Sequence, residues 1–211
     1  MIKMVAFDLD GTIGDTIPFS LEAFRRAVAP YVEYTLSDAE IFQTFGLNEI
    51  GMIKTVTGGQ WKNALADFYL LYEQLHDSCL LPYKGINNII HCLNEKGVRT
   101  ALITGKGMRA CKITLEKFGM TDFFCDIVTG LETRPNKTES IKHLLEKYKL
   151  QPNEFYYIGD AVSDIKDARN ADVVCLSAAW GDFADVKELS KLNAENMFYT
   201  TEQLYEFFSM L

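Results

Sequence analysis

The chain has 211 residues, of which 48% are hydrophobic and 24% charged, and its formal net charge at pH 7 is −8. This composition is typical of a water-soluble globular protein that can bury a sizeable core in one large or two small domains. The excess of 29 acidic over 21 basic residues argues against nucleic acid or an anionic membrane as the main partner. No apolar stretch is long enough to span a bilayer, and the apolar N-terminal run is too short for a signal peptide.

The cysteines argue for a reducing compartment. They are odd in number and show no CxxC spacing, so we expect buried free thiols in the cytoplasm and no disulfide or zinc framework. They are Cys79, Cys92, Cys111, Cys125 and Cys175.

An apolar run at residues 2–7 predicts a strand at the centre of a parallel sheet, because such strands are buried on both faces. Asp8 and Asp10 follow it directly and can point the same way, since side chains alternate along a strand. Gly11 lets the chain turn where a Cβ would be in the way. Ligands of such sheets bind outside the carboxyl ends of the strands, so both carboxylates are candidate site residues.

Residues 16–81 predict an all-helical insert. Pro18 suits the start of a helix, and the pattern from Ser37 to Glu40 is a capping box that opens another. A stripe of apolar residues at helical spacing within residues 61–75 predicts a third helix that packs on its neighbours. An insert placed directly after the first aspartates can fold over the site as a lid, closing as a rigid body about two hinges.

The remaining residues alternate between strand and helix patterns, which predicts a doubly wound α/β domain built from residues 1–15 and 82–211. Four further strands are expected, and the tail at residues 197–211 should add a short strand and a closing helix. The four strands cover residues 98–103, 124–128, 155–158 and 173–176.

Polar residues follow four of the predicted strands. Thr104 and Gly105 follow the second strand, and Asp160 and Asp164 follow the fourth. Each residue taken alone has an ordinary structural explanation, such as a strand-end turn for Thr104 or a helix N-cap for Asp160. Their order along the chain, an acid pair, a hydroxyl, a base and a second acid pair, favours one shared site.

The run from Phe7 to Thr12 resembles the first motif of the haloacid dehalogenase-like superfamily in its phosphotransferase form, and the four loops match that superfamily's four motifs in order. The run from Asp10 to Thr16 and the later Ala179-Trp180-Gly181 are most similar to the phosphoglycolate phosphatase-type subgroup with a helical C1 cap. The resemblance implies a Rossmann-like core and a phosphatase of small phosphorylated metabolites.

The resemblance also implies the roles of the site residues. Asp8 would attack phosphorus and form an aspartyl-phosphate, and Asp10 would protonate the leaving alkoxide and then activate water. Mg²⁺ would be held by Asp8, Asp160 and the backbone carbonyl of Asp10, with Asp164 as a ligand through water or as an anchor behind the ligands. Thr104, with Gly105 beside it, and a basic residue would hold the phosphoryl oxygens.

Two residues compete for the basic position, Arg134 and Lys137. Lys137 is favoured because it begins a predicted helix, as in one variant of the family motif, but Arg134 stays open. In the insert, Thr44 and Asn48 around Gly46 are candidates for contacts with the non-phosphate end of the substrate.

Other functions remain alternatives to a phosphatase. A sugar phosphomutase resembling β-phosphoglucomutase would use the same machinery, and a receiver-type signalling module also places Asp, Thr and Lys at strand ends with Mg²⁺. Asp10 argues against the receiver, because a switch needs no leaving-group acid, and against the dehalogenase and phosphonate-cleaving branches, which replace this residue. A non-catalytic module is disfavoured because no motif residue is missing. We expect a monomer or weak homodimer.

Overall fold

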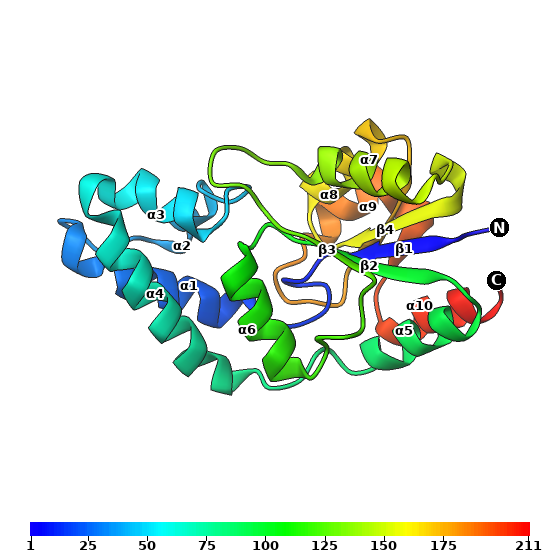
Figure 1. The fold of residues 1–211 in the computed structure, drawn as a ribbon, viewed down its shortest axis with the longest axis horizontal. Coiled ribbons are helices and arrows are strands. Elements are labelled where there is room, and N and C mark those ends of the chain that lie inside the picture. The colour runs from blue at the N-terminus through cyan, green and yellow to red at the C-terminus, as the bar shows by residue number, and fades with distance from the viewer.

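The computed structural model describes all 211 residues. Its centre is one sheet of six strands in the order β3-β2-β1-β4-β5-β6, with every neighbouring pair parallel (Figure 1). The predicted doubly wound parallel sheet is therefore confirmed, with the first strand at its centre. The strands are β1 (Met4–Phe7), β2 (Arg99–Ile103), β3 (Asp126–Val128), β4 (Phe155–Gly159), β5 (Val174–Ala178) and β6 (Met197–Phe198).

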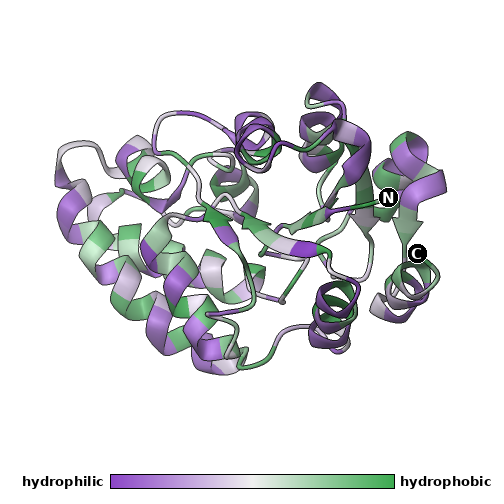
Figure 2. Cartoon of the chain, turned by 45° about the vertical axis from the view of Figure 1, so that its right-hand side comes forward, coloured by the Kyte–Doolittle hydropathy of each residue, from purple (hydrophilic) through white to green (hydrophobic).

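Helices cover both faces of the sheet because β1 buries its side chains alternately on each face. Val5 and Phe7 pack on one side, against α5 (Ile86–Glu95), α6 (Met108–Phe118) and α10 (Thr201–Ser209). Met4 and Ala6 pack on the other side. The helices there are α7 (Lys137–Tyr148), α8 (Val162–Asn170) and α9 (Val186–Asn193) (Figure 1). In Figure 2 the hydrophobic residues gather in the strands and on the helix faces turned toward them.

Between β1 and α5 the chain forms helices and turns but no strand. These helices lie at the end of the molecule away from both termini (Figure 1). Their apolar faces share a core that includes Phe24, Phe68 and Tyr72, and Ala110 of α6 joins it from the sheet domain. The helices are α1 (Ile17–Val28), α2 (Asp38–Phe42), α3 (Glu49–Thr57) and α4 (Trp61–Leu75).

Residues at the helix N-termini explain where α1 and α2 begin. Pro18 lies in the first turn of α1, where its missing N–H costs nothing. The capping box before α2 forms as predicted: the Glu40 N–H donates to Ser37 Oγ at 3.4 Å, and the Ser37 N–H donates to Glu40 Oε2 at 2.9 Å.

Asn48 and α4 are two of the places where hydrogen bonds join the insert to the sheet domain. At the first, Asn48 is buried: its Nδ2 donates to the Gly130 carbonyl at 3.1 Å and its backbone N–H donates to the Leu131 carbonyl at 2.8 Å. At the second, the hydroxyls of Tyr72 in α4 and Thr114 in α6 lie 2.7 Å apart. The insert therefore lies closed against the loop after β3 and against α6.

All five cysteines are free thiols. Cys111 and Cys175 are buried as expected, but Cys79 and Cys92 are half-buried and Cys125 is exposed, so the expected burial is wrong for these three. Cys125 lies in the loop directly before the short strand β3. No helix combines the length and the hydropathy that a membrane crossing requires.

Gly51 tests how tightly the insert is bound. A Cβ on Gly51 would lie 2.1 Å from the carbonyl oxygen of Glu132, so Gly51→Ala should push α3 away from the sheet domain. We expect a net loss of about 1–2 kcal/mol in the free energy of unfolding. A Cβ this close to a backbone oxygen should cost about 2–3 kcal/mol, the upper part of the usual range for overpacking, and this outweighs a gain in helix propensity of about 1 kcal/mol. Chemical denaturation measures this change.

Gly59→Ala is the matched control, since a Cβ there meets no atom within 4 Å. It should leave stability unchanged or raise it slightly. Equal stability of the two variants would show that the approach of α3 to Glu132 is not constrained.

Candidate active site

The carboxyl ends of the central strands bring three aspartates together. Asp8 follows β1, Asp160 follows β4, and Asp164 lies in the first turn of α8. Each offers a carboxylate oxygen, and these oxygens lie within 4.8 Å of one another. All three residues are buried, and Asp164 is inaccessible to solvent.

Lys137 is the cation of this cluster. It is the first residue of α7, and its Nζ lies 3.0 Å from Asp8 Oδ2 and 2.6 Å from Asp164 Oδ1. Burial opposes its charge, but Asp164 and Asp8 more than compensate and raise the pKa of Lys137 well above its usual value. The ammonium is therefore a permanent charge in the site.

One ammonium does not balance three carboxylates. Burial, opposed by Lys137, raises the pKa of Asp8 to about 7. Burial, with Asp164 and Asp8 nearby, also raises the pKa of Asp160 well above its usual range. Buried carboxylates with raised pKa values are typical of functional sites and of sites that take a cation.

The residues fit a hard cation such as Mg²⁺. Asp8 Oδ1 is buried and has no hydrogen-bond partner, so one ligand oxygen is free. Both oxygens of Asp164 are already engaged: Oδ2 accepts from the Ala161 N–H at 2.9 Å, and Oδ1 accepts from Lys137 and from the Tyr157 hydroxyl. Asp8 and Asp160 are thus the better ligands, and Asp164 positions Lys137 behind them.

Gly11 makes room for Asp160. A Cβ on Gly11 would lie 2.2 Å from Asp160 Oδ2, and the φ of +74° at Gly11 is one that side chains disfavour. Thr12 Oγ1 also donates to Asp160 Oδ1 at 3.2 Å. The turn after β1 therefore holds the carboxylate delivered by β4.

Asp10 is held by two residues that the sequence did not single out. Its Oδ1 lies 2.9 Å from Lys106 Nζ and accepts from the Thr16 hydroxyl. Lys106 also donates to Ser20 Oγ in α1 at 3.2 Å. The one available signal for Lys106 was its position two residues after Thr104, in a loop already expected at the site.

The other candidate residues lie in different surroundings. Thr104 is buried, and its Oγ1 accepts from the Lys106 N–H at 3.1 Å. Arg134 is exposed and pairs with Glu139 at 2.6 Å, away from the aspartates. The Thr44 hydroxyl donates to the Ile41 carbonyl in its own turn. Of the two bases, the structure brings only Lys137 to Asp8.

Asn48 is engaged elsewhere as well. Its Nδ2 donates to the Gly130 carbonyl, and its Oδ1 accepts from the Gly51 N–H as the N-cap of α3. Its amide therefore binds the insert to the sheet domain.

A cavity of about 540 Å³ opens above the aspartates. Asp8, Asp10, Gly105, Lys137 and Asp160 line it from the strand ends. Aromatic rings close the opposite side: Phe42 and Phe45 come from the insert, and Phe183 comes from the loop after β5. The ring centroids of Phe42 and Phe183 lie 6.1 Å apart. The insert therefore covers the carboxylate cluster and forms part of the cavity wall.

Curated relatives cover nearly the whole chain. A protein of Caldanaerobacter subterraneus subsp. tengcongensis, whose name marks it as a PpaX-type pyrophosphatase, is 27% identical over 213 residues, which cover 100% of this chain and 94% of the relative. A phosphoglycolate phosphatase of Vibrio vulnificus is 27% identical over 194 residues, which cover 85% of each chain.

A solved structure shows the same fold. CbbY from Rhodobacter sphaeroides, in complex with phosphate, has a TM-score of 0.81 and 16% sequence identity, with 97% of this chain and 96% of that one covered. The family model for haloacid dehalogenase-like hydrolases matches residues 5–178, a span that includes every strand end of the site. With this match and the aspartates at the ends of β1 and β4, the chain belongs to the haloacid dehalogenase-like hydrolase family.

Proposed function

We propose that this protein, a phosphoric monoester hydrolase of the haloacid dehalogenase-like family, hydrolyses small phosphorylated metabolites through an aspartyl-phosphate on Asp8, with Mg²⁺ as cofactor. The observation that carries the proposal is the state of Asp8: one buried oxygen has no partner, and the other lies 3.0 Å from Lys137. Relatives named as phosphatases and pyrophosphatases support phosphate chemistry.

Asp8 is placed to act as the nucleophile. Its carboxylate oxygen forms the bond to phosphorus while the bond from phosphorus to the ester oxygen breaks, and water then cleaves the aspartyl-phosphate to release phosphate. Mg²⁺ bound by Asp8, Asp160 and the Asp10 carbonyl would supply the positive charge that lets a carboxylate approach a doubly negative phosphate ester.

Lys137 supplies the positive charge that belongs to the chain itself. Its ammonium is fixed by Asp164 and lies next to the attacking carboxylate, so it can hold a phosphoryl oxygen as charge builds up there. Thr104 and Gly105 follow β2 at the same sheet edge, and Gly105 lines the cavity, which supports their part in holding the other phosphoryl oxygens.

Asp10 is placed to serve the leaving group. Thr16 and Lys106 hold its carboxyl in one orientation at the cavity wall. Asp10 donates a proton to the departing ester oxygen and later accepts one from the attacking water, so the proton balance closes over the cycle.

The leaving group tests this division of roles. Asp10→Asn should lower kcat/KM at least tenfold more for alkyl phosphates than for acetyl phosphate, because acetate departs without a proton and an alkoxide does not. This constant covers only the steps up to departure of the leaving group, so the later activation of water by Asp10 does not affect it. Asp8→Asn should abolish both reactions. An equal loss for both substrates in Asp10→Asn would remove the acid role, and turnover by Asp8→Asn would remove the aspartyl-phosphate. A phosphomutase would interconvert isomers without releasing phosphate.

Two variants test which basic residue, Lys137 or Arg134, holds the phosphoryl oxygens. Lys137→Ala should lower kcat/KM about a hundredfold or more, the scale of about 3 kcal/mol for losing one preorganised donor. Arg134→Ala should change it less than threefold, because Arg134 is exposed and pairs with Glu139. Circular dichroism checks that both variants fold. The opposite ranking would assign the role to Arg134.

Magnesium binding should depend on pH. Since the pKa of Asp8 is raised to about 7 in the metal-free protein, the carboxyl is mostly protonated at pH 6 and must lose its proton to bind a cation. Isothermal titration should therefore show tighter Mg²⁺ binding at pH 8 than at pH 6. Asp160→Asn should bind weakly at both, whereas Asp122→Asn, an exposed acid outside the cluster, should match the wild type. Equal affinity at the two pH values would contradict this view of Asp8.

A further inference from the structure

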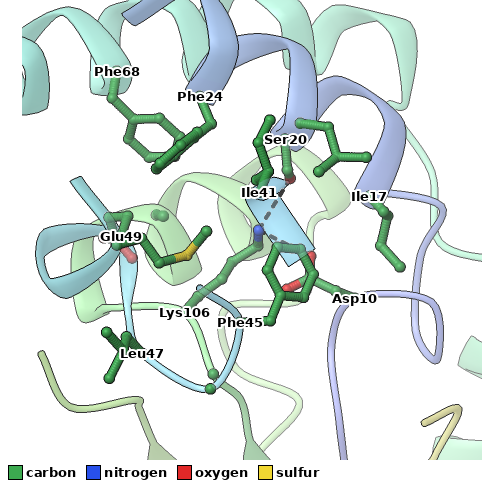
Figure 3. A pocket seen from close by; sticks show the side chains of 15 residues that line it. Asp10, Ile17, Ser20, Phe24, Ile41, Phe45, Leu47, Glu49, Phe68 and Lys106 are labelled. Carbon is green, nitrogen blue, oxygen red and sulfur yellow. Dashed lines mark hydrogen bonds and ion pairs between the residues drawn. The ribbon is translucent and has the colours of Figure 1, made fainter. Parts of the chain in front are cut away.

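A second, smaller cavity of about 100 Å³ lies between the insert and the sheet domain (Figure 3). Nine of the 15 residues that line it are hydrophobic. All four helices of the insert contribute to these apolar walls, with Ile17, Leu21, Phe24, Ile41, Met52 and Phe68.

This cavity continues the one above the aspartates. Asp10, Ile17, Phe45, Gly46 and Gly105 line both cavities. Asp10 thus lies where the two cavities meet, and it is the residue that we propose protonates the ester oxygen. With phosphorus at Asp8 and the ester oxygen at Asp10, the organic part of a substrate extends into the apolar cavity.

The charged groups of this cavity give it no net positive charge. The Lys106 ammonium lies 2.9 Å from Asp10 Oδ1 and donates to Ser20 Oγ at 3.2 Å (Figure 3). The third charged residue in the wall is a carboxylate, Glu49 of α3. In this structure the walls therefore carry two carboxylates and one ammonium, which Asp10 and Ser20 hold. When Asp10 carries the proton that it donates in the proposed reaction, the walls carry one charge of each sign, so in neither state is their net charge positive.

Glu49 is fixed where it is. It is buried, its Oε2 accepts from the Gly107 N–H at 2.7 Å, and its Oε1 accepts from the Tyr69 hydroxyl at 2.8 Å. A substrate carboxylate brought into this low-dielectric cavity would lose its hydration and face Glu49, and the walls offer no net positive charge to offset these costs.

The volume sets a size limit. A dry apolar cavity of about 150 Å³ takes benzene, so about 100 Å³ suits a smaller group of about four carbon atoms.

We propose that this cavity holds the alcohol part of the substrate and selects phosphate monoesters of small, uncharged, mainly apolar alcohols over esters whose alcohol carries a carboxylate. The proposal rests on the phosphatase function proposed above. It separates this chain from relatives whose names assign them phosphoglycolate, an ester that carries a carboxylate.

The test compares two esters of nearly equal shape in the presence of Mg²⁺. Isobutyl phosphate and phosphoglycolate have the same number of non-hydrogen atoms, but one ends in two methyl groups and the other in a carboxylate. Release of phosphate should give a kcat/KM at least tenfold higher for isobutyl phosphate. A wild-type protein that turns over phosphoglycolate equally well or better, or that turns over neither ester, overturns the proposal.

Two variants and one control test whether residues of this cavity determine which ester the protein prefers. Glu49→Gln removes the negative charge and should raise the ratio of phosphoglycolate to isobutyl phosphate turnover at least fivefold; an unchanged ratio overturns the role of Glu49.

Leu47→Phe narrows the cavity from a half-buried position and should lower the ratio of isobutyl phosphate to acetyl phosphate turnover. Leu81→Phe makes the same change at a residue that is 75% exposed and should leave this ratio unchanged. Equal ratios in the two Phe variants would show that the cavity does not hold the alcohol.

Acetyl phosphate separates this proposal from the function on which it rests. If the protein releases no phosphate even from acetyl phosphate, the phosphatase function fails. If acetyl phosphate is hydrolysed and phosphoglycolate is preferred over isobutyl phosphate, the phosphatase function stands and only the selectivity is wrong.

Discussion

The site depends on the crowding of three buried carboxylates around one ammonium. Asp8, Asp160 and Asp164 lie together at the ends of parallel strands, and only Lys137 balances them. Burying charge without compensation is energetically unfavourable. This is why the pKa values of Asp8 and Asp160 are raised in the folded protein. In the proposed function, a bound cation would relieve that energetic cost and would supply the positive charge that a doubly negative substrate needs.

The surrounding fold makes this crowding possible. Gly11 and Gly159 leave space for carboxylates, since a Cβ on either would lie within 2.4 Å of an oxygen of Asp160 or Asp164. The Ala161 N–H and the Tyr157 hydroxyl fix Asp164, which in turn fixes Lys137. Hydrogen bonds from β4 and from the start of α8 therefore fix these side chains at the sheet edge, in addition to the loops that carry them.

The insert has two functions in this arrangement. It covers the cavity above Asp8 with aromatic rings, and it forms the apolar walls of the second cavity. Glu49 and Asn48, at the start of α3, bind it to the loops after β2 and β3, so the helix that lines the second cavity also contacts the strand-end loops. In the proposed function, substrate selection and contact with the strand ends therefore depend on one segment.

The sequence by itself determined the sheet, its central strand, the helical character of the insert and the acidic residues at the strand ends. These features follow from period, caps and turn residues, which act between near neighbours in the chain. Tertiary structure decided the rest. It placed Lys137 rather than Arg134 beside Asp8, and it engaged Thr44 and Asn48 in backbone contacts instead of the cavity. It also joined Lys106 to Ser20 across 86 positions and Thr12 to Asp160 across 148. No local pattern records such contacts, because they depend on how the strands order themselves and on how the insert folds back over them.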